Sequence, residues 1–576
     1  MARPDVAPPD FGQAHAYDFI VCGGGTSGCV VARRLAEHPD VTVLLLEAGC
    51  DDQVDAVRNA TDWMSNIGSA RDWRFEAEPC AALSGRRAAL PMGKVLGGGS
   101  SINGLIWARG HKHDFDAWAE QTGDPGWSYE SVLDIYKRIE HWDGAPDPKR
   151  RGTDGPVFIT KPRDPVPLTA ALMAAAQQAG IPPVEDLNGA AMEGAGNCGL
   201  PNVTVKGQNE RVSMASAYLR PIMTQSNLTV TLQATVQRLK FAGTRAVGVE
   251  FMLNGRLHEA RANCEVILSL GAIHTPKVLM LSGIGDEREL KRHGIERLQH
   301  LPGVGQNFQD HILVAGCVWE YRRPEPPRNN SAEFTFFCKS AAALATPDLQ
   351  PVLEERAFGS DALRGEYSLP ADPAAAWTLA PGLVRPVSRG YLALTGNRPE
   401  DRVSIHANFL SERRDVDALK TAVALCREIG NAPALRDFVK REIMPGPLDP
   451  AAMERWLRRA AGTYFHQTCT AKMGRDAMSV VDGSLRVYGV EALRIADGSI
   501  MPQITTGNTM APCVVIGERA AELALRTHAG RSTAGRSTAG RTLAGRTLAG
   551  RTLAGRTHRA AGAPLHIPID REESST

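Results

Sequence analysis

An apolar run that ends in a glycine-rich turn constrains the fold of this chain more than any other feature. Tyr17–Cys22 reads YDFIVC and is followed at once by Gly23–Gly28, GGGTSG, which fits the pattern G-x-G-x-x-G. Cys29–Glu37 reads as a helix, and Val41–Glu47 reads as a second apolar strand. A strand, a helix and a strand within about thirty residues form a right-handed parallel crossover unit. The sequence therefore predicts a doubly wound α/β sheet near the N-terminus.

The glycines of this turn have different expected roles, all of which serve a bound dinucleotide. Gly23 makes the tight turn, Gly25 lets the backbone approach a pyrophosphate, and Gly28 lets the helix pack closely on the strand. Glu47 ends the second strand, where a carboxylate accepts hydrogen bonds from the adenosine ribose and disfavours NADP. The residues predicted to hold the dinucleotide are Gly23, Gly25, Thr26, Ser27, Gly28 and Glu47. The pattern does not say which dinucleotide is bound.

A second glycine cluster lies within residues 92–110, MGKVLGGGSSINGLIWARG. Gly97–Ser101 offers backbone N–H groups without Cβ obstruction, and hydroxyls and the Asn103 amide follow. Such a stretch suits close approach to phosphates and to the edge of a flat ring system. A glycine cluster alone is more often a flexible loop, so this one gains weight only together with the first.

Composition excludes several classes of protein. The 576 residues carry a net charge of +1, which gives no general attraction to nucleic acid. No run of about 18 apolar residues is present, so we expect no spanning helix, although peripheral association with a membrane stays open. The first residues also lack the apolar core of a secretory signal. The 11 cysteines show no metal-type spacing, which predicts reduced thiols, no metal site and a cytoplasmic protein.

The chain is long enough for more than one domain. Alternating apolar stretches within 228–271 predict antiparallel strands, and 312–464 combines strands, Pro-rich loops and an apolar helix near 416–430. We expect an α/β protein in which a Rossmann-like domain accompanies a second, α+β substrate domain built on an antiparallel sheet. The expected division is a leader at 1–15, nucleotide-domain segments at 16–160, 206–311 and 465–527, a substrate-domain segment or an excursion at 161–205, a substrate domain at 312–464 and a tail at 528–576.

The tail has a different character from the rest of the chain. A last helix is expected from about Pro512 to Arg526, and beyond Thr527 a five-residue repeat of the type AGRTL begins. The repeat carries regular arginines, no acids and few apolar residues, so it buries too little surface to offset its ordering entropy. We therefore expect a disordered basic tail. Contact with RNA or anionic lipid is the less favoured interpretation.

At this point the sequence resembles the glucose–methanol–choline (GMC) oxidoreductases, which bind FAD. Residues 92–110 look like the first signature of that family, and 271–285, GAIHTPKVLMLSGIG, look like its second. LPGVGQNFQDH at 301–311 and LRIADGSIMP at 493–502 are further similar stretches. The resemblance runs from about residue 16 to 526, and the motifs follow one another in the order of the family.

The resemblance implies FAD as the cofactor and assigns residues to it. Some members attach FAD through a histidine just before the asparagine of the first signature, but Ile102 stands there, which implies non-covalent binding. The implied contacts to pyrophosphate and flavin are Gly93, Lys94, Leu96, Gly97, Ser101, Asn103 and Gly104, with Val236 at the adenine and Ala496, Asp497, Thr509 and Met510 over the flavin.

The resemblance also implies a catalytic pair, His466 in YFHQTCT and Asn508 in TTGNTMAP. Alcohol oxidation moves a hydride from carbon to flavin and removes the hydroxyl proton. A neutral imidazole near physiological pH accepts that proton. The Asn508 amide does not titrate, but it can donate to the substrate oxygen and orient the alcohol.

Several neighbouring residues have competing interpretations. Cys469 lies three residues after His466, but no oxyanion motif accompanies it, so we reject a Cys–His nucleophile. His311 is a possible site residue as well, but it is more easily explained as the support of a loop. Glu333 could pair with a cationic substrate, and Phe465 could add a cation–π wall, although a solvent-facing glutamate explains Glu333 equally well.

The predicted function is FAD-dependent oxidation of a primary alcohol to an aldehyde, with choline-like, aryl and aliphatic alcohols all open. The bulk of Tyr464, two residues before His466, favours a quinone-type acceptor over oxygen. One alternative is a non-redox flavoprotein of the same fold, a hydroxynitrile lyase or a decarboxylase. The other is a binding protein in which the basic tail matters most. The oligomeric state is not predictable.

Overall fold

The seven-stranded sheet forms around the apolar run at the start of the described chain. In the computed structural model, which describes residues 16–547 and side chains up to residue 529, β1 (Ala16–Cys22) is flanked by β2 (Val43–Leu46) and β13 (Arg256–Leu268), both parallel to it. All four residues of β2 are buried, as a parallel strand covered on both faces requires. α1 (Thr26–Ala36) makes the crossover between β1 and β2. The predicted strand–helix–strand unit is therefore present, with ends shifted by a few residues.

The rest of this sheet comes from distant parts of the sequence. β10 (Leu228–Thr231) pairs parallel with β2, and β26 (Leu493–Ile495) pairs parallel with β13. β11 (Thr235–Ala242) and β12 (Arg245–Leu253) continue from β13 as an antiparallel meander. The expectation of antiparallel strands in 228–271 holds for the meander but is wrong for β10, because alternation within one strand does not reveal the direction of its neighbour.

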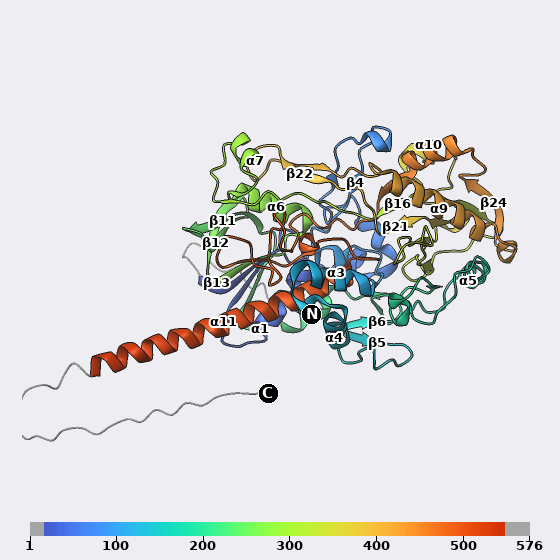
Figure 1. Ribbon diagram of the computed structural model, residues 1–576. Helices are drawn as coiled ribbons and strands as arrows, with labels where there is room; N and C mark the ends of the chain where they lie inside the picture. Colours follow the sequence, from blue (N-terminus) through green and yellow to red (C-terminus); the bar gives the residue numbers. More distant parts are fainter. Residues whose placement is uncertain (1–15, 548–576) are drawn as a thin grey trace, which may run out of the picture. The chain divides into compact units, whose positions relative to one another are not determined.

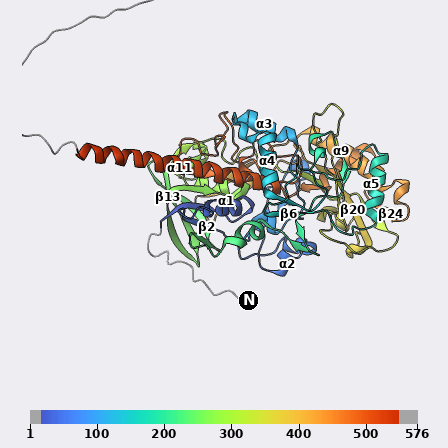
Figure 2. The same ribbon diagram turned by 90° about the horizontal axis from the view of Figure 1, so that it is seen from below.

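A second sheet of six antiparallel strands is also present, as expected. Its order is β24 (Val439–Met444), β17 (Val318–Tyr321), β20 (Ala376–Ala380), β19 (Val352–Glu354), β18 (Thr335–Phe336) and β7 (Cys198–Gly199). Trp319 and Trp377 stack between β17 and β20 with ring centroids 4.5 Å apart. Both views place the two sheets toward opposite ends of this part of the protein (Figures 1 and 2). The domain boundaries stay a proposal, since contacts join the described residues up to Leu525 into one unit.

Helices cover the two sheets and connect them. The longer ones beside the second sheet are α5 (Leu168–Gln178), α9 (Arg413–Gly430) and α10 (Pro450–Ala460). The remaining helices before the last are α2 (Asp55–Arg58), α3 (Lys112–Thr122), α4 (Tyr129–Ile139), α6 (Gly271–Leu281), α7 (Glu287–Arg292) and α8 (Asp361–Arg364). The remaining strands are β3 (Phe75–Glu76), β4 (Ala89–Leu90), β5 (Glu140–Trp142), β6 (Val157–Ile159), β8 (Val205–Lys206), β9 (Glu210–Arg211), β14 (Ile284–Gly285), β15 (Gln299–His300), β16 (Ile312–Val314), β21 (Gly382–Leu383), β22 (Tyr391–Leu394), β23 (Val403–His406) and β25 (Ala461–Thr463).

The pairing of β16 with β25 is the part of the fold that builds the site. The two strands run antiparallel, with Ile312 opposite Thr463. His311 precedes β16 and His466 follows β25, so this register brings the two histidines together although 155 positions separate them. Each strand is only three residues long, and neither stands out in the sequence.

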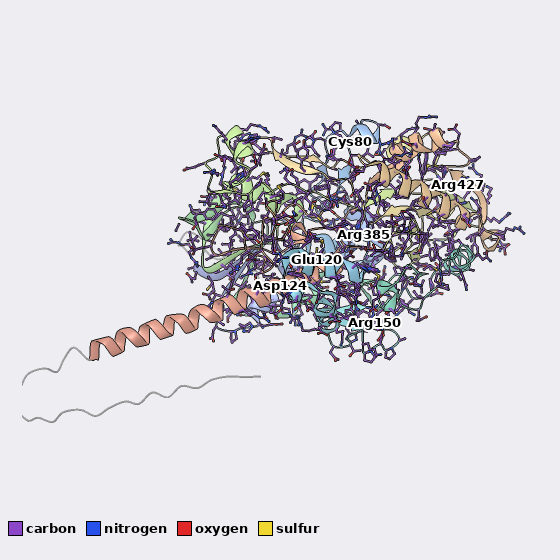
Figure 3. All side chains as sticks on the ribbon, in the orientation of Figure 1. Cys80, Glu120, Asp124, Arg150, Arg385 and Arg427 are labelled. Atoms are coloured by element: carbon purple, nitrogen blue, oxygen red, sulfur yellow. The ribbon has the colours of Figure 1, made fainter. Side chains whose placement is uncertain are left out.

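Apolar packing rather than surface charge holds the described part of the chain together. Surface ion pairs such as Arg150–Glu193 (2.8 Å) and Arg427–Glu442 (2.7 Å) are common, and both arginines are labelled in Figure 3. Exposed pairs of this kind contribute only about 0–1 kcal/mol each. The core of the first sheet, by contrast, contains fully buried side chains from β1, β2, β13 and α1.

The last helix differs from the prediction. α11 runs from Met510 to Thr547 instead of ending near Arg526, so residues 528–547 are helical and not disordered. A helix that has already formed extends at little cost through Ala, Leu and Arg, the good helix formers of the repeat. The rest of the predicted tail, 548–576, and the leader lie outside the described residues. Within the described range no helix is long and apolar enough to cross a membrane.

Candidate active site

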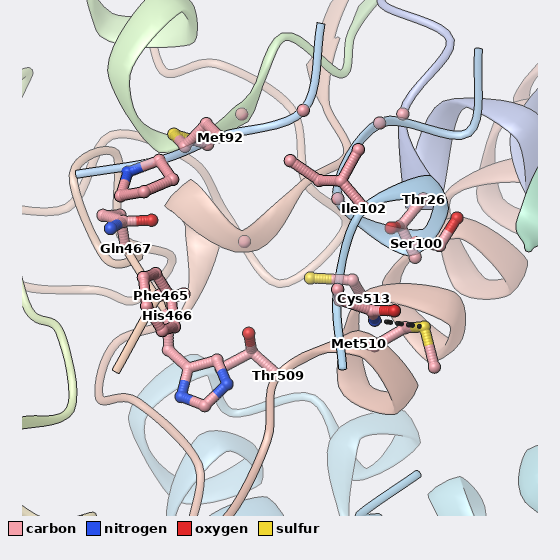
Figure 4. Close-up of a pocket in the computed structure, with 18 of the residues that line it drawn as sticks. Thr26, Met92, Ser100, Ile102, Phe465, His466, Gln467, Thr509, Met510 and Cys513 are labelled. Atoms are coloured by element: carbon pink, nitrogen blue, oxygen red, sulfur yellow. Dashed lines mark hydrogen bonds between the residues drawn. The ribbon is translucent and has the colours of Figure 1, made fainter. Parts of the chain in front are cut away.

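One cavity of about 270 Å³ connects the glycine turn after β1 with the histidine after β25. In Figure 4, Thr26, Ser100 and Ile102 lie on one side of this cavity, and Phe465, His466 and Gln467 lie on the other. Apolar side chains such as Ile102, Leu313 and Val352 line much of it. A few polar groups in a mostly apolar cavity are typical of a small-molecule site.

The first glycine turn has the geometry that the sequence predicted. Gly23 has a φ of +100°, and a Cβ there would lie 2.3 Å from the Ser269 carbonyl oxygen. A Cβ at Gly28 would lie 1.9 Å from the Gly23 carbonyl oxygen, so only glycine allows α1 to approach β1 this closely. At Gly25 the nearest atom to an added Cβ is 4.0 Å away, which leaves the backbone open toward the cavity.

The second glycine cluster lies directly against the first. The Gly97 N–H donates to the Gly24 carbonyl oxygen at 2.7 Å, and Gly97 has a φ of +88°. A Cβ at Gly98 would lie 2.7 Å from the Gly25 Cα. At Gly99, which lines the cavity, an added Cβ would meet no atom of the chain within 4 Å. The two turns therefore form one backbone-lined cradle, in which side chains would fill the space that a pyrophosphate requires.

Glu47 stands at the carboxyl end of β2 and lines the same cavity. Its carboxylate accepts hydrogen bonds from the Gly24 N–H at 2.8 Å and the Gly49 N–H at 2.7 Å. Burial raises the pKa of Glu47 to about 7, and the two N–H donors oppose that shift. Asp497, across the cavity, accepts from the Gly271 N–H at 2.9 Å and the Thr275 hydroxyl at 2.6 Å.

Most of the residues assigned from the sequence line this cavity. Those that do are Gly23, Gly25, Thr26, Ser27, Glu47, Gly93, Asn103, Gly104, Val236, Phe465, His466, Asp497, Asn508, Thr509 and Met510. Those that do not are Gly28, Lys94, Leu96, Gly97, Ser101, Ala496 and Glu333. Several of the second group support the cradle: the Ser101 hydroxyl donates to the Leu96 carbonyl oxygen at 2.6 Å, and the Lys94 Nζ lies 4.7 Å from the ring centroid of Trp73, which lines the cavity.

Glu333 is not brought to the cavity, contrary to the expectation that it faces a substrate. Glu333 is fully buried, and its carboxylate accepts hydrogen bonds from the Val166 N–H at 2.6 Å and from the Asn329 side chain. Glu354, from the neighbouring strand β19, lines the cavity instead. The alternation around Glu333 suggested a strand, but the strand begins only at Thr335, and the pattern did not reveal which side chains meet the cavity.

His466 is held on three sides by residues that face it. Its backbone N–H donates to the Asp310 carboxylate at 2.9 Å. Its Nδ1 lies 2.9 Å from the His311 Nδ1, and its Nε2 lies 3.2 Å from the Asn508 Nδ2. Burial lowers the pKa of His466 to about 3, so the imidazole is neutral near physiological pH.

The hydrogen-bond chain around His466 selects one tautomer. The Gln350 Nε2 donates to the Asn508 Oδ1 at 3.0 Å, which turns the Asn508 Nδ2 donor toward the His466 Nε2. The His466 Nε2 then accepts, so its Nδ1 carries the proton and donates to the His311 Nδ1. The basic nitrogen of the neutral ring is therefore the one beside Asn508.

Sequence reasoning missed several of these residues. His311 was interpreted as the support of a loop, and Asp310, Gln350 and Glu354 were not singled out. The signal for Asp310 and His311 was a pair of titratable residues directly before a buried strand. The signal for Glu354 was its spacing of two from Val352 on β19, since residues two apart on a strand share a face.

Comparison with known proteins identifies the family. The family model described as GMC oxidoreductase matches residues 17–313 with its N-terminal part and 386–517 with its C-terminal part. The human mitochondrial choline dehydrogenase is 36% identical over 545 residues, which cover 88% of this chain and 89% of that protein. The oxygen-dependent choline dehydrogenase of Vibrio vulnificus is 37% identical, with 89% and 95% covered.

Solved structures share the same fold. The pyridoxine 4-oxidase of Mesorbium loti superposes with a TM-score of 0.83 at 31% identity, covering 88% of this chain and 98% of that one. A formate oxidase of Aspergillus oryzae RIB40, studied for modification of its FAD, superposes with a TM-score of 0.82 at 25% identity. This superposition covers 90% of this chain and 99% of the formate oxidase chain.

The cradle described above fits the cofactor of this family, because its glycines leave backbone N–H groups open to a pyrophosphate and Glu47 stands where a ribose is held. Ile102, which lines the cavity, offers no atom for a covalent link, in keeping with non-covalent FAD. The chain belongs to the GMC oxidoreductase family and is an FAD-dependent oxidoreductase that acts on CH–OH donors.

Proposed function

We propose that this enzyme oxidises a primary alcohol to an aldehyde, with His466 as the base that removes the hydroxyl proton. The observation that carries the proposal is a neutral imidazole at one end of the cofactor cavity, with Asn508 beside its basic nitrogen. A general base must be uncharged before it accepts a proton and must lie within hydrogen-bond reach of it. His466 meets the first condition, and its place in the cavity lining allows a bound alcohol to meet the second.

Each residue of the site has a distinct part in this reaction. The alcohol hydroxyl takes the place of the Asn508 amide at the His466 Nε2 and passes its proton there, while the Asn508 amide donates to the substrate oxygen. The His466 Nδ1–H bond to His311 keeps the ring from turning as it becomes charged. FAD, when bound, supplies the acceptor for the hydride that leaves the carbinol carbon. The alcohol loses two electrons and two hydrogens in total, one as a proton and one as the hydride.

We infer that the electrons then pass to a quinone-type carrier in preference to oxygen. Tyr464 is buried and lines the cavity beside His466, with the two ring centroids 5.0 Å apart and nearly parallel. This ring narrows the space through which oxygen would approach. Reoxidation of the alcohol-reduced enzyme by air within seconds would contradict this inference, whereas rapid reoxidation by a soluble quinone in the absence of air would support it.

The choice of alcohol is guided by the relatives, several of which are named choline dehydrogenases. A choline-like alcohol is therefore the first candidate, with aliphatic and aryl alcohols beside it. The cytoplasmic location, with or without peripheral membrane contact, stays a proposal that fractionation of cells would test.

The experiment that tests the proposed function is the visible spectrum of the purified enzyme during anaerobic addition of primary alcohols. Bleaching of the flavin bands by at least one alcohol, with the matching aldehyde formed, is the expected result. Flavin bands that no alcohol bleaches would favour the non-redox alternatives, a hydroxynitrile lyase or a decarboxylase. Release of intact FAD on denaturation is expected as well, because Ile102 forms no covalent bond.

A further inference from the structure

A single carboxylate faces the apolar part of the cavity without the hydrogen bonds that support the other buried acids. Glu354 and Val352 both line the cavity from β19, while Leu353 between them packs in the core of the second sheet. Glu354 is 8% exposed. The neighbouring cavity wall is apolar, with Ile106, Leu313 and Ala332 packed in one cluster with Val352.

The partners of Glu354 are unusually few. Within the described part of the chain, the only polar contact of its carboxylate is an ion pair in which the Arg356 Nε lies 3.8 Å away, too far for a hydrogen bond. Glu47 and Glu333, which are buried as well, each accept from at least one backbone N–H. A buried carboxylate without donors is costly. Burial accordingly raises the pKa of Glu354 to about 7, and the charge of Arg356 opposes that shift only in part.

Glu354 lies on the substrate side of the cavity. Val352, two residues before Glu354 on the same face of β19, packs in one cluster with Tyr464, and all three residues line the cavity. The Tyr464 ring in turn stacks beside the His466 ring. A molecule whose hydroxyl reaches His466 therefore passes Tyr464 and apolar walls and extends toward Glu354.

We propose that Glu354 binds a protonated amino group of the substrate, so that the preferred alcohols are amino alcohols whose ammonium group carries N–H donors. The inference rests on the proposed alcohol oxidation. An ammonium group supplies both the positive charge and the donors that this carboxylate lacks. The apolar walls contact the carbon chain between the two ends. A quaternary ammonium has charge but no donor, so it satisfies the site less well.

The test compares pairs of alcohols that differ only in whether the chain ends in an ammonium or a methyl group, such as aminobutanol and pentanol. The series of amino alcohols runs from ethanolamine to aminohexanol, each with the methyl-ended alcohol of the same length. Anaerobic reduction of the flavin gives kcat/KM for each. The wild-type enzyme is expected to prefer the amino alcohol by at least about tenfold at one chain length, with choline between the two classes.

The variant Glu354→Gln keeps the size of the side chain and removes its charge. We expect the preference for the amino alcohol to fall by roughly 10- to 100-fold, because the variant loses one hydrogen bond between charged groups. The matched control Glu296→Gln alters an exposed glutamate and is expected to leave the preference unchanged. Should Glu354→Gln not fold, competitive inhibition of the wild-type enzyme by butylammonium, at least tenfold stronger than by a neutral ether of the same length, carries the test.

The outcomes separate this inference from the function on which it rests. The ammonium subsite would be overturned if the methyl-ended alcohol were used as well as or better than the amino alcohol at every chain length. A preference for the amino alcohol that survives Glu354→Gln would also overturn it, while the alcohol oxidation stands. If no alcohol of either kind reduces the flavin, the proposed function itself is wrong, and the inference falls with it.

Discussion

The Nδ1 atoms of His311 and His466 lie 2.9 Å apart in a buried site, so one ring must donate to the other. Burial lowers the pKa of both rings, that of His311 also through the nearby His466, so both are neutral near physiological pH. Since Asn508 donates to the other nitrogen of His466, the proton between the rings belongs to His466. The relationship fixes the tautomer of the base and makes His311 a positioning residue.

Replacement of His311 tests this role. In His311→Leu the His466 Nδ1–H loses its acceptor, and we expect flavin reduction by alcohol to slow on the order of 10- to 100-fold, part of the roughly 100- to 10,000-fold that a positioned general base contributes. His311→Asn offers an amide oxygen near the place of the Nδ1 and should restore most of the rate. Equal rates in the leucine and wild-type proteins, measured by stopped-flow absorbance, would show that His311 has no such role.

A negative charge at position 508 should disable the base in a pH-dependent way. In Asn508→Asp a carboxylate takes the place of the amide, 3.2 Å from the His466 Nε2, and an opposite charge favours the protonated ring. The pKa of His466 therefore rises, and the rate of flavin reduction falls at neutral pH but recovers partly as the pH increases. Asn508→Ala removes the amide without adding charge and should lower the rate at all pH values. Two variants with the same flat pH profile would refute the charge argument.

The glycine cradle predicts which substitution expels the cofactor. At Gly99, which lines the cavity, an added Cβ meets no atom of the chain within 4 Å, so the Gly99→Val protein should fold but retain far less FAD. Gly365 is also free of neighbours within 4 Å but lies outside the cavity lining, so Gly365→Val is the matched control. The ratio of flavin to protein absorbance after purification is the measurement. Full FAD content in Gly99→Val would mean that the cofactor does not contact this turn.

The buried acid Glu355 predicts how stability depends on pH. Burial, with the charges of Glu333 and Glu354, raises the pKa of Glu355 to about 9, whereas a glutamate in the unfolded chain titrates at about 4.3. The folded state thus binds the extra proton between these two values. The stabilisation that this proton gives to the folded state is complete below the pKa of the unfolded glutamate. It is lost as the pH rises through the higher pKa of the folded state.

The variant Glu355→Gln removes that titration and keeps an oxygen that can accept from the Arg328 N–H, which donates to Glu355 at 2.7 Å. We expect the Tm of the wild-type protein to fall more steeply than that of the variant as the pH increases from mildly acidic to alkaline. Glu296→Gln, at an exposed position, serves as the control. Parallel Tm curves for Glu355→Gln and the wild type would contradict the assignment.

Local patterns in the sequence predicted the parts of the fold that are local. The strand, glycine turn and helix from β1 to α1 follow one another directly, so the period of apolar residues and the placement of Gly23 and Gly28 were sufficient. His466 and Asn508 were assigned through the resemblance to the family, and the structure places both beside the cavity.

The parts that could not be predicted depend on pairing between distant segments. His311 reaches His466 only through the register of two three-residue strands, and Gln350 reaches Asn508 from 158 positions away. Glu333 and Glu354 both occur among apolar residues, but Glu333, in the segment before β18, accepts a hydrogen bond from the distant Val166 N–H, whereas Glu354 on β19 lines the cavity. α11 continued past the predicted end because helix extension depends on an existing helix more than on composition.

The most direct test of the account is the rate of anaerobic flavin reduction by an alcohol that the wild-type enzyme oxidises. The rate is compared between the wild type and His466→Ala, and, for the wild type, between the alcohol and its carbinol-deuterated form. We predict that His466→Ala, still loaded with FAD, reduces roughly 100- to 10,000-fold more slowly, because it lacks the general base. Deuteration should slow the wild-type enzyme, since the carbinol hydrogen is transferred. An FAD-loaded His466→Ala protein that reduces as fast as the wild type would contradict the central claim that His466 is the base.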